Sequence, residues 1–355
     1  MEVFYKSDSF GDEAIQDKTN RKSDHINLAL HSQTPVQEAD NRFYYEPMIS
    51  AFPGTISEEI PFAGKKLKVP IWVSSMTGGN RLSGTINRNL AMACKEFGMG
   101  MGLGSCRMLL DDDTHFNDFN VRSIIGEDAP LFANMGIAQI EEMVEKKETD
   151  DLRRLIGRLQ ADGLIIHVNP LQEWVQPEGN TILNPPAETI EKLLERIDFK
   201  LIVKEVGQGF GPQSIKRLLQ LPLAAIEFGA FGGTNFSKVE IHRSSIRNNE
   251  LYQPFVNVGV SAEEMVDLIN DLISKGEKFI CNQLIISGGI RNYLDGYYLT
   301  EKSILPAIYA QASAFLKYSQ GDYSELQQFV ASQIEGYRMA KSFLTLKVPK
   351  SIKPV

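Results

Sequence analysis

The chain has 355 residues, of which 43% are hydrophobic and 23% charged, and its formal net charge is −8. This length and apolar content are enough for a sizeable buried core in one large domain or two. No block of Lys and Arg is long enough to form a nucleic-acid or membrane-binding arm, so neither nucleic acid nor membrane is an expected partner.

Cysteine usage and the N-terminus bear on the cellular compartment. The three cysteines, Cys94, Cys106 and Cys281, are odd in number and scattered, which fits reduced core thiols in a cytosolic protein better than a disulfide framework. No CxxC pair or Cys/His cluster indicates zinc. The N-terminus lacks the apolar region of a secretion signal, and nowhere do about 18 apolar residues run together. We therefore predict a cytoplasmic protein.

The first 65 residues are mixed and rich in charge. Within them, Arg21 and Lys22 lie shortly before His25 and a short apolar run. A basic pair in such a setting is typical of a solvated helix face.

From residue 70 onward, short apolar runs that each end in a polar residue recur along the chain. Such runs predict buried strands followed by turns. The expected strands are residues 71–75, 99–104, 131–133, 164–166, 201–203, 224–228, 284–286 and 313–316. Helical spacing of apolar residues fills the gaps, and a Ser261-x-x-Glu264 capping box predicts one helix start. The expected helices are residues 83–97, 152–159, 190–197, 215–219, 262–272 and 324–346.

Eight such units spread over about 250 residues have the size and alternation of a TIM (β/α)8 barrel. We predict a single α/β domain of this class. Residues 1–65 would be an N-terminal segment that contributes to substrate binding, 66–320 the barrel, and 321–355 a C-terminal helix that packs on it. A doubly wound open sheet stays an alternative, because periodicity alone does not close a barrel.

Four polar residues gather behind the expected strand at 164–166. His167, Asn169, Gln172 and Glu173 fall within seven residues, and buried polar side chains need partners. Hard oxygen ligands suit Mg²⁺, which one carboxylate would hold together with waters and substrate phosphates, so Glu173 is the candidate metal ligand. His167 and Asn169 would then contact a diphosphate, with Gln172 nearer the reacting end. The alternative is a hydrogen-bonded network without a ligand.

Two glycine-rich turns stand late in the chain, at residues 231–234 and 287–291. Glycines after strands let backbone N–H groups approach a phosphate, and the last loops of a barrel are the usual phosphate site. Either turn alone is equally consistent with an ordinary tight turn. Lys204 follows another expected strand and would be a cation at the barrel mouth, or would form a salt bridge with Glu205 or Glu227. Two such turns beside a lone lysine predict a phosphorylated cofactor.

The motifs described above, together with further segments in the same order along the chain, resemble those of the type 2 isopentenyl-diphosphate delta-isomerases, the FMN-dependent form. The matching segments run from roughly residue 20 to residue 295, and the His-x-Asn-x-x-Gln-Glu segment is the specific one. They are Arg21-Lys22-x-x-His25, Met76-Thr77-Gly78-Gly79, Gly104-Ser105, Ala133-Asn134, His167-x-Asn169-x-x-Gln172-Glu173 with Pro177-Glu178-Gly179, Lys204-Glu205, Gly232-Gly233-Thr234 with Glu240 and Arg243, and Ser287-Gly288-Gly289-Ile290-Arg291.

The resemblance implies a TIM barrel that interconverts isopentenyl and dimethylallyl diphosphate with FMN and Mg²⁺, assembled as a homo-tetramer or homo-octamer. The residues that it assigns to the flavin ring and its surroundings are Met76, Thr77, Gly78, Ser105, Asn134, Lys204 and Thr234. Those that it assigns to the flavin phosphate are Gly289 and Arg291. Its substrate contacts are Arg21, Lys22, His25, His167, Asn169 and Gln172, and its metal ligand is Glu173. The expected catalytic residues are Gln172, His167 and Lys204.

The chain departs from the family pattern in two places. Residues 227–231 read Glu-Phe-Gly-Ala-Phe where the family has an Asp and an extra glycine. After Asp295, a longer segment replaces the family's Asp-x-x-Lys helix and its Ala-Leu-Gly-Ala. Ala310 and Gln311 are therefore our candidates for the second half of the phosphate site, where backbone N–H donors would remain.

The implied reaction is a 1,3-proton shift. Protonating an unactivated alkene demands a strong acid beside a water-free pocket. We expect reduced FMN, with NADPH as the reductant, to serve as acid and base without net redox change. Lys204 would favour the anionic reduced ring, and Gln172 would orient or relay a proton.

Two other classes of function stay open at this stage. An FMN-dependent oxidoreductase of the 2-hydroxy-acid oxidase type would use the same barrel, but such enzymes keep an active-site histidine late in it, and here no histidine follows His242. A non-catalytic barrel that binds a phosphorylated ligand, or merely assembles, would explain the altered segment after Asp295.

Overall fold

A computed structural model describes residues 24–26, 28–54, 59–75, 81–243 and 246–347. The chain divides into two units, Met1–Phe43 and Tyr44–Val355, which we describe separately. The described part of the first unit holds the 3-10 helix η1 (Val36–Glu38), and strand β1 (Phe43–Tyr45) begins at its last residue. Arg42 and Asp40 form an ion pair there at 2.7 Å.

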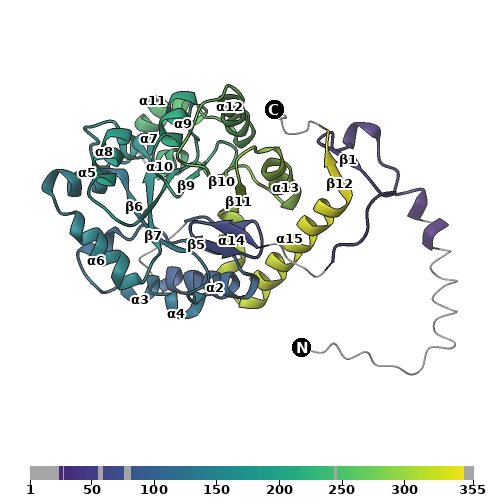
Figure 1. Ribbon diagram of the computed structural model, residues 1–355, viewed down its shortest axis with the longest axis horizontal. Helices are drawn as coiled ribbons and strands as arrows, with labels where there is room; N and C mark the ends of the chain where they lie inside the picture. The colour runs from purple at the N-terminus through teal and green to yellow at the C-terminus, as the bar shows by residue number, and fades with distance from the viewer. Residues whose placement is uncertain (1–23, 27, 55–58, 76–80, 244–245, 348–355) are drawn as a thin grey trace. The chain divides into compact units, whose positions relative to one another are not determined.

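The second unit is built around a closed barrel of eight parallel strands (Figure 1). Around the barrel, neighbouring strands follow the order β10-β11-β4-β5-β6-β7-β8-β9, and every neighbouring pair is parallel. The predicted (β/α)8 class is confirmed, and an open sheet is excluded. The strands are β4 (Ile71–Val73), β5 (Gly100–Gly102), β6 (Leu131–Gly136), β7 (Gly163–Val168), β8 (Lys200–Glu205), β9 (Ala225–Glu227), β10 (Leu284–Ser287) and β11 (Ala307–Gln311).

Helices connect the strands and surround the barrel (Figure 1). The longer ones are α2 (Arg81–Phe97), α5 (Ile137–Lys146), α6 (Thr149–Leu159), α8 (Pro186–Leu194), α11 (Ile246–Val256), α12 (Ala262–Ser274), α13 (Tyr293–Lys302) and α15 (Tyr323–Phe343). Shorter ones are η2 (Arg107–Leu110), α3 (Phe116–Phe119), α4 (Arg122–Ile125), α7 (Pro170–Val175), α9 (Pro212–Leu219), α10 (Phe236–Arg243) and α14 (Ser313–Ser319). The expected capping box at Ser261 and Glu264 is present and begins α12.

The expected eighth strand at residues 313–316 is wrong. These residues begin helix α14, and the eighth strand is β11 instead, which pairs with β10 and β4. Phe315 and Ser319 are buried one helical turn apart, as on the inner face of a helix. A short apolar run cannot by itself distinguish a strand from a buried helix segment.

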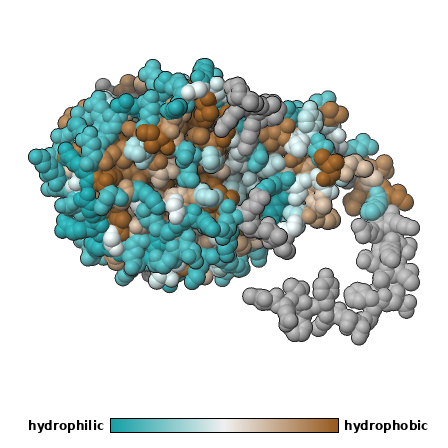
Figure 2. All heavy atoms as spheres, in the orientation of Figure 1, coloured by the Kyte–Doolittle hydropathy of each residue, from teal (hydrophilic) through white to brown (hydrophobic). Residues whose placement is uncertain are grey.

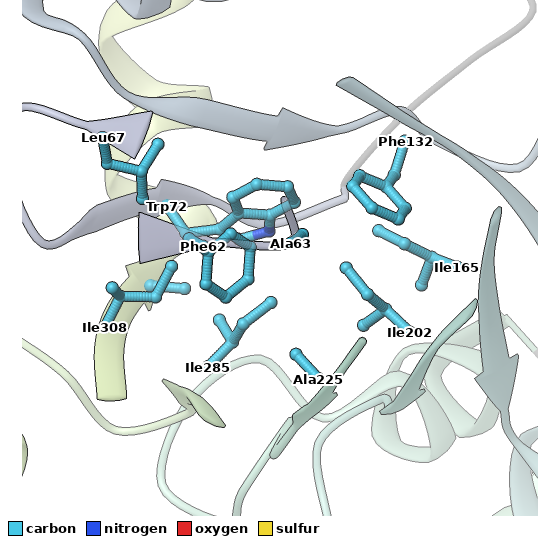
Figure 3. Close-up of a cluster of buried hydrophobic side chains, with 11 residues drawn as sticks. Phe62, Ala63, Leu67, Trp72, Phe132, Ile165, Ile202, Ala225, Ile285 and Ile308 are labelled. Atoms are coloured by element: carbon cyan, nitrogen blue, oxygen red, sulfur yellow. The ribbon is translucent and has the colours of Figure 1, made fainter. Parts of the chain in front are cut away.

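The hairpin of β2 (Ile60–Phe62) and β3 (Lys65–Leu67) lies at the amino-terminal ends of the barrel strands. Its Phe62 packs against Trp72 of β4, with ring centroids 5.4 Å apart, and Trp72 in turn contacts Phe132. Figure 3 shows these rings among aliphatic side chains that point inward from the surrounding strands. The hairpin is held there by Lys200, at the start of β8, whose ammonium donates to the carbonyl of Ala63 at 2.7 Å. The hairpin therefore fills the interior of the barrel at this end, and the polar strand ends lie at the opposite, carboxyl end.

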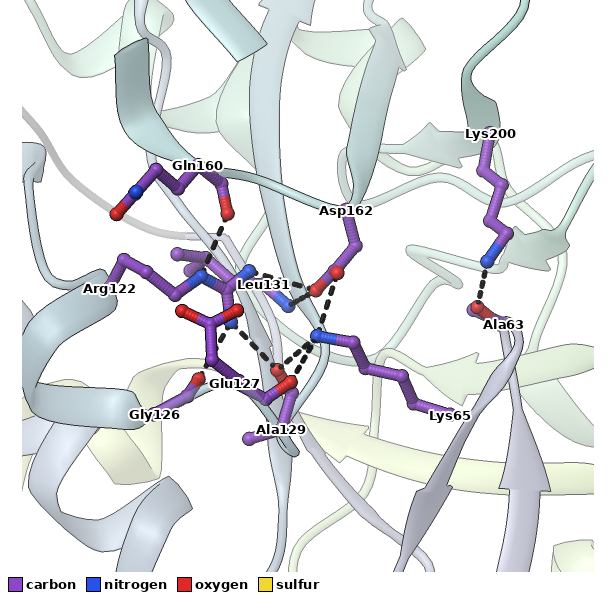
Figure 4. A network of polar contacts seen from close by, with 10 residues as sticks. All are labelled: Ala63, Lys65, Arg122, Gly126, Glu127, Ala129, Leu131, Gln160, Asp162 and Lys200. Carbon is purple, nitrogen blue, oxygen red and sulfur yellow. Dashed lines mark hydrogen bonds and ion pairs between the residues drawn. The ribbon is translucent and has the colours of Figure 1, made fainter. Parts of the chain in front are cut away.

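A polar network also fixes the hairpin (Figure 4). The guanidinium of Arg122 is buried and donates to the carbonyls of Gln160, at 2.7 Å, and of two further residues, and to Asp162 Oδ2. Lys65 of β3 forms an ion pair with the other oxygen of Asp162 at 2.7 Å. Burial raises the pKa of Asp162, but hydrogen bonds from Lys65, the Leu131 N–H and Arg122 outweigh it, and the pKa lies below its ordinary value.

The C-terminal helix α15 contacts α2, α13 and α14 on the outside of the barrel, and strand β12 (Leu344–Leu346) follows it. In the view of Figure 2, hydrophilic side chains cover most of the helices at the rim. The three cysteines are free and buried. No helix within the described residues has the length and apolar character needed to cross a membrane.

Candidate functional site

Charged and polar side chains form a row across adjacent strands at the carboxyl end of the barrel. The register aligns Gly136 of β6 with His167 of β7, His167 with Lys204 of β8, and Lys204 with Glu227 of β9. Residues that pair across parallel strands project to the same face of the sheet. Polar residues that each follow or end a buried run in the sequence, such as His167, Lys204 and Glu227, therefore lie side by side in the fold.

Two pockets open above this row, with volumes of about 170 Å³ and about 440 Å³. Ser75, Lys204, Val206 and Phe236 line both, so we treat them as one cleft with a small and a large part. The small part is also lined by Gly104, Ser105, Asn134, His167 and Gln172. The large part is also lined, among others, by Thr234, Gly289, Arg291, Ala310 and Gln311.

His167 lies in the small part of the cleft. Its Nδ1 is 2.6 Å from Asn134 Oδ1, and burial together with the positive charge of Lys204 lowers its pKa to about 4. The ring is therefore neutral at pH 7. With the amide oxygen of Asn134 as acceptor, the proton is on Nδ1, and Nε2 is left as a hydrogen-bond acceptor.

Lys204 is mostly buried, and its ammonium has defined partners behind the cleft. Its Nζ lies 3.2 Å from Glu227 Oε1 and donates to the backbone carbonyl of Glu205 at 3.1 Å. Of the two salt bridges open from the sequence, the one to Glu227 forms. Ser74, which follows β4, donates its hydroxyl to the same oxygen of Glu227.

A chain of side-chain hydrogen bonds connects α7 with α10. Asn169, immediately before α7, donates to Gln172 Oε1 at 3.1 Å and to Glu173 Oε1 at 3.2 Å. Gln172 Nε2 donates to Glu240 Oε1 at 3.2 Å, and Glu240 also pairs with Arg243. The acceptor and donor ends of the Gln172 amide are therefore both assigned, which fixes its orientation. Pro170 favours the start of α7 because its ring suits the first helical position.

Glu173 is half-buried and points one carboxylate oxygen at the backbone N–H of Asn180, 2.7 Å away. Within the described residues, no group of three or more His, Cys, Asp or Glu side chains could hold a metal ion. A site of one carboxylate completed by waters and substrate phosphates, as Mg²⁺ uses, is compatible with this arrangement.

The two glycine-rich turns meet in the large part of the cleft. A Cβ built on Gly233 would lie 3.1 Å from the backbone N of Gly289, and one built on Gly232 would lie 3.4 Å from its Cα. Gly288 and Gly289 have φ of 90° and 76°, which L side chains rarely adopt. The glycines therefore leave an open backbone surface, with Arg291 and Lys317 among the lining side chains.

Several buried polar atoms around the cleft have no hydrogen-bond partner among the described residues. Ser75 Oγ and Gln311 Oε1 belong to residues that line the cleft, whereas Asn169 Oδ1 and Glu227 Oε2 belong to residues that line neither part of it. Buried polar groups are normally satisfied, so orphaned ones at a cleft indicate a ligand. Together with the glycine surface and the cations, they fit a polar, phosphate-bearing cofactor such as FMN.

The structure does not address every expected site residue. Arg21, Lys22, Met76, Thr77 and Gly78 lie outside the described residues. His25 is exposed within the first unit, whose placement relative to the barrel is not defined.

Ser75, Phe236 and Lys317 also line the cleft, although they were not among the residues predicted from the sequence. Ser75 is the polar last residue of the expected strand 71–75, so the signal was present. Lys317 directly follows residues 313–316, so the same signal was present there, although these residues begin helix α14 and are not a strand.

Comparison with known proteins identifies relatives along most of the chain. The chain is 34% identical to an isopentenyl-diphosphate delta-isomerase of Rickettsia typhi, over 78% of this chain and 79% of the relative. It is 32% identical to the protein of the same name from Rickettsia felis, over 92% and 94% of the two chains. No family model matches.

Solved structures share the fold at low identity. A flavocytochrome b2 variant with sulfite bound has a TM-score of 0.59 at 12% identity, covering 85% of this chain and 72% of that one. A mandelate oxidase variant with an FMN adduct has a TM-score of 0.50 at 12% identity, covering 85% and 88%. At this identity the likeness supports the barrel fold alone.

Proposed function

The chain belongs to the isopentenyl-diphosphate delta-isomerase family, and from this premise we propose that it is of the FMN-dependent type 2. It would interconvert isopentenyl and dimethylallyl diphosphate by a 1,3-proton shift. The observation that carries the proposal is the cleft at the carboxyl ends of the strands, where His167, Lys204 and Gln172 line one part and two glycine turns line the other.

FMN is the proposed cofactor, and the mandelate oxidase with an FMN adduct has the same barrel. When bound in reduced form, FMN would supply the acid and base of the proton shift without net redox change. The residues that we propose to hold its phosphate are Gly289, Arg291, Ala310 and Gln311. The other residues that we propose to hold it are Ser105, Asn134, Lys204 and Thr234, together with Met76, Thr77 and Gly78 from outside the described residues. NADPH is the proposed reductant.

The diphosphate of the substrate would bind beside α7. Glu173 would hold Mg²⁺, which is otherwise coordinated by waters and phosphate oxygens. His167 and Asn169 would contact the diphosphate. Arg21, Lys22 and His25 would neutralise it further.

The chain's own side chains would orient and desolvate the reacting atoms. Gln172 is oriented by its bonds to Asn169 and Glu240, so it can position or relay a proton at a fixed place. Val206 and Phe236 line both parts of the cleft and would exclude water from it. Lys204 would supply positive charge where negative charge develops.

We also propose that the chain is cytoplasmic and forms a homo-tetramer or homo-octamer. Large apolar side chains are exposed on α7 and α11, with Trp174 74%, Leu251 62% and Phe255 53% accessible, which supports a further interface. Analytical ultracentrifugation would measure the assembly, and a monomer at micromolar concentration would contradict this part of the proposal.

The deciding experiment is anaerobic turnover of isopentenyl diphosphate with FMN, Mg²⁺ and NADPH, beside an identical sample without reductant. We expect dimethylallyl diphosphate in the reduced sample only, with no stoichiometric consumption of NADPH. Equal activity in both samples would refute the reduced-flavin mechanism.

A variant pair sharpens the result. Gln172→Leu keeps the side-chain size but removes its hydrogen bonds, and should lower kcat at least tenfold. Gln327→Leu, which removes a hydrogen bond to Glu96 on the outside of the barrel, is the matched control and should leave kcat unchanged. Turnover of a 2-hydroxy acid without isomerisation would instead favour an oxidoreductase.

A further inference from the structure

Glu227 is a buried carboxylate whose position the proposed reaction does not explain. It ends strand β9, has no exposed surface, and pairs in register with Lys204 of β8. Its Oε1 lies 3.2 Å from Lys204 Nζ and accepts the hydroxyl of Ser74. Its Oε2 has no hydrogen-bond partner among the described residues.

Burying a carboxylate costs free energy that one ion pair does not always offset. A carboxylate that only filled space here would be better replaced by an apolar side chain. Lys204 lines both parts of the cleft, whereas Glu227 lies wholly beneath the surface. The ammonium thus has a fixed anion on one side and the ligand space on the other, and its second bond, to the Glu205 carbonyl, limits its movement.

We propose that Glu227 is a positioning residue that sets how much positive charge Lys204 presents to the cleft, and through it the reduction potential of the bound flavin. The inference depends on the proposed function only in that FMN binds in the cleft. An ammonium paired with a carboxylate exerts a weaker field than an unpaired one. The pair therefore stabilises the anionic reduced ring less than Lys204 alone would.

The test is the midpoint potential of bound FMN in Glu227→Gln, which removes the charge but keeps the shape. In this variant, we expect the ratio of the affinities for reduced and oxidised FMN to be at least tenfold higher than in the wild type. For a two-electron couple this corresponds to a rise of about 30 mV. Glu227→Asp keeps the charge but shortens the side chain, so its potential should fall between those of the wild type and Glu227→Gln.

The coupling to Lys204 is tested in a Lys204→Met background. There, adding Glu227→Gln should shift the potential clearly less than it does in the presence of Lys204, because the part of the effect that comes from holding the ammonium in place is lost. A shift of the same size in that background would overturn the proposal, since Glu227 would then act on the flavin directly. A wild-type potential in a folded, FMN-binding Glu227→Gln protein would also overturn it. If that variant does not fold, a wild-type potential in Glu227→Asp has the same meaning.

These measurements use no isoprenoid substrate. A protein that shows the expected shift but does not isomerise isopentenyl diphosphate would refute the proposed function and leave this inference standing. An active isomerase without the shift would refute only this inference. Failure of the wild-type protein to bind FMN would refute both.

Discussion

Replacing Gly288 by alanine tests whether the turn after β10 is a rigid ligand-binding surface. Gly288 has φ of 90°, and an added Cβ would lie less than 3.0 Å from both the carbonyl oxygen and the nitrogen of Ala230. The positive φ costs an L residue about 1–2 kcal/mol. Both contacts are with backbone, which cannot rotate away, and overpacking of this kind costs about 1–3 kcal/mol. We expect Gly288→Ala to lower the free energy of unfolding by about 2–5 kcal/mol.

Gly276→Ala is the matched control. Gly276 has φ of 80°, but nothing lies within 4 Å of an added Cβ, so only the conformational cost of about 1–2 kcal/mol applies. Urea denaturation of the two variants separates the contact cost from the conformational cost. Because the methyl group added in Gly288→Ala would displace the backbone that carries Gly289, FMN should also bind more weakly to that variant. Losing one hydrogen bond to a charged group weakens binding roughly 10- to 100-fold.

A Gly288→Ala protein that is no less stable than Gly276→Ala, and that binds FMN with wild-type affinity in a fluorescence titration, would show that the turn is not a rigid ligand-binding surface. The turn would then have room to relax, and the close approach to Ala230 would not constrain it. Weaker FMN binding in Gly276→Ala would also contradict the prediction, because that residue lies outside the cleft.

Four further predictions concern the polar residues. Arg122→Met should lower the free energy of unfolding by about 1–3 kcal/mol in urea, because the carbonyls of Gln160 and Gly126 lose their side-chain donor and Asp162 keeps only Lys65 and the Leu131 N–H; a loss below about 1 kcal/mol would contradict this. A diphosphate beside His167 should raise the lowered pKa of that ring, so pyrophosphate should bind more tightly, by calorimetry, as pH falls from about 7 towards 5. The same pH dependence of the pyrophosphate affinity in His167→Gln would exclude this contact. Glu173→Gln should raise the Mg²⁺ concentration needed for half-maximal turnover at least tenfold, whereas Glu178→Gln, an exposed control, should not. Lys22→Ala should raise KM for isopentenyl diphosphate far more than Kd for FMN, and an unchanged KM would return Lys22 to an ordinary surface role.

The strands that the sequence predicted well are those with a continuous run of β-branched or aliphatic residues. Strand β7 is an example, since Leu164 to Ile166 are fully buried and lie between β6 and β8. Strand β11 was missed because it ends in the polar Gln311 and a more apolar run a few residues later was assigned to the strand instead. Residues 307–311 and 313–316 are both partly buried, so burial does not tell the strand from the helix. Only the pairing of β11 with β4 does, and that contact is between residues far apart in the sequence.

In the site, too, the local pattern could be predicted from the sequence, whereas the contacts between strands could not. The sequence placed Lys204 at a strand end but left its partner open between Glu205 and Glu227. In the fold, Glu205 turns its carboxylate to the backbone N–H groups of residues 207–209, and burial raises its pKa. The carboxylate of Glu227 reaches the lysine because β8 and β9 are in register. Adjacent residues on a strand face opposite sides, so the nearer residue in sequence was the less suitable partner.

The electrostatics of the cleft also bear on the source of the proton. His167 is neutral at pH 7 and has an acceptor nitrogen left, so in this state it cannot protonate an alkene. The amide of Gln172 does not ionise, and Lys204 is already paired with Glu227. Among the described residues, the side chains of the small pocket can thus orient and stabilise charge, but none is a strong acid. The proposal that reduced FMN supplies the acid agrees with this, because it asks none of these side chains to donate the proton.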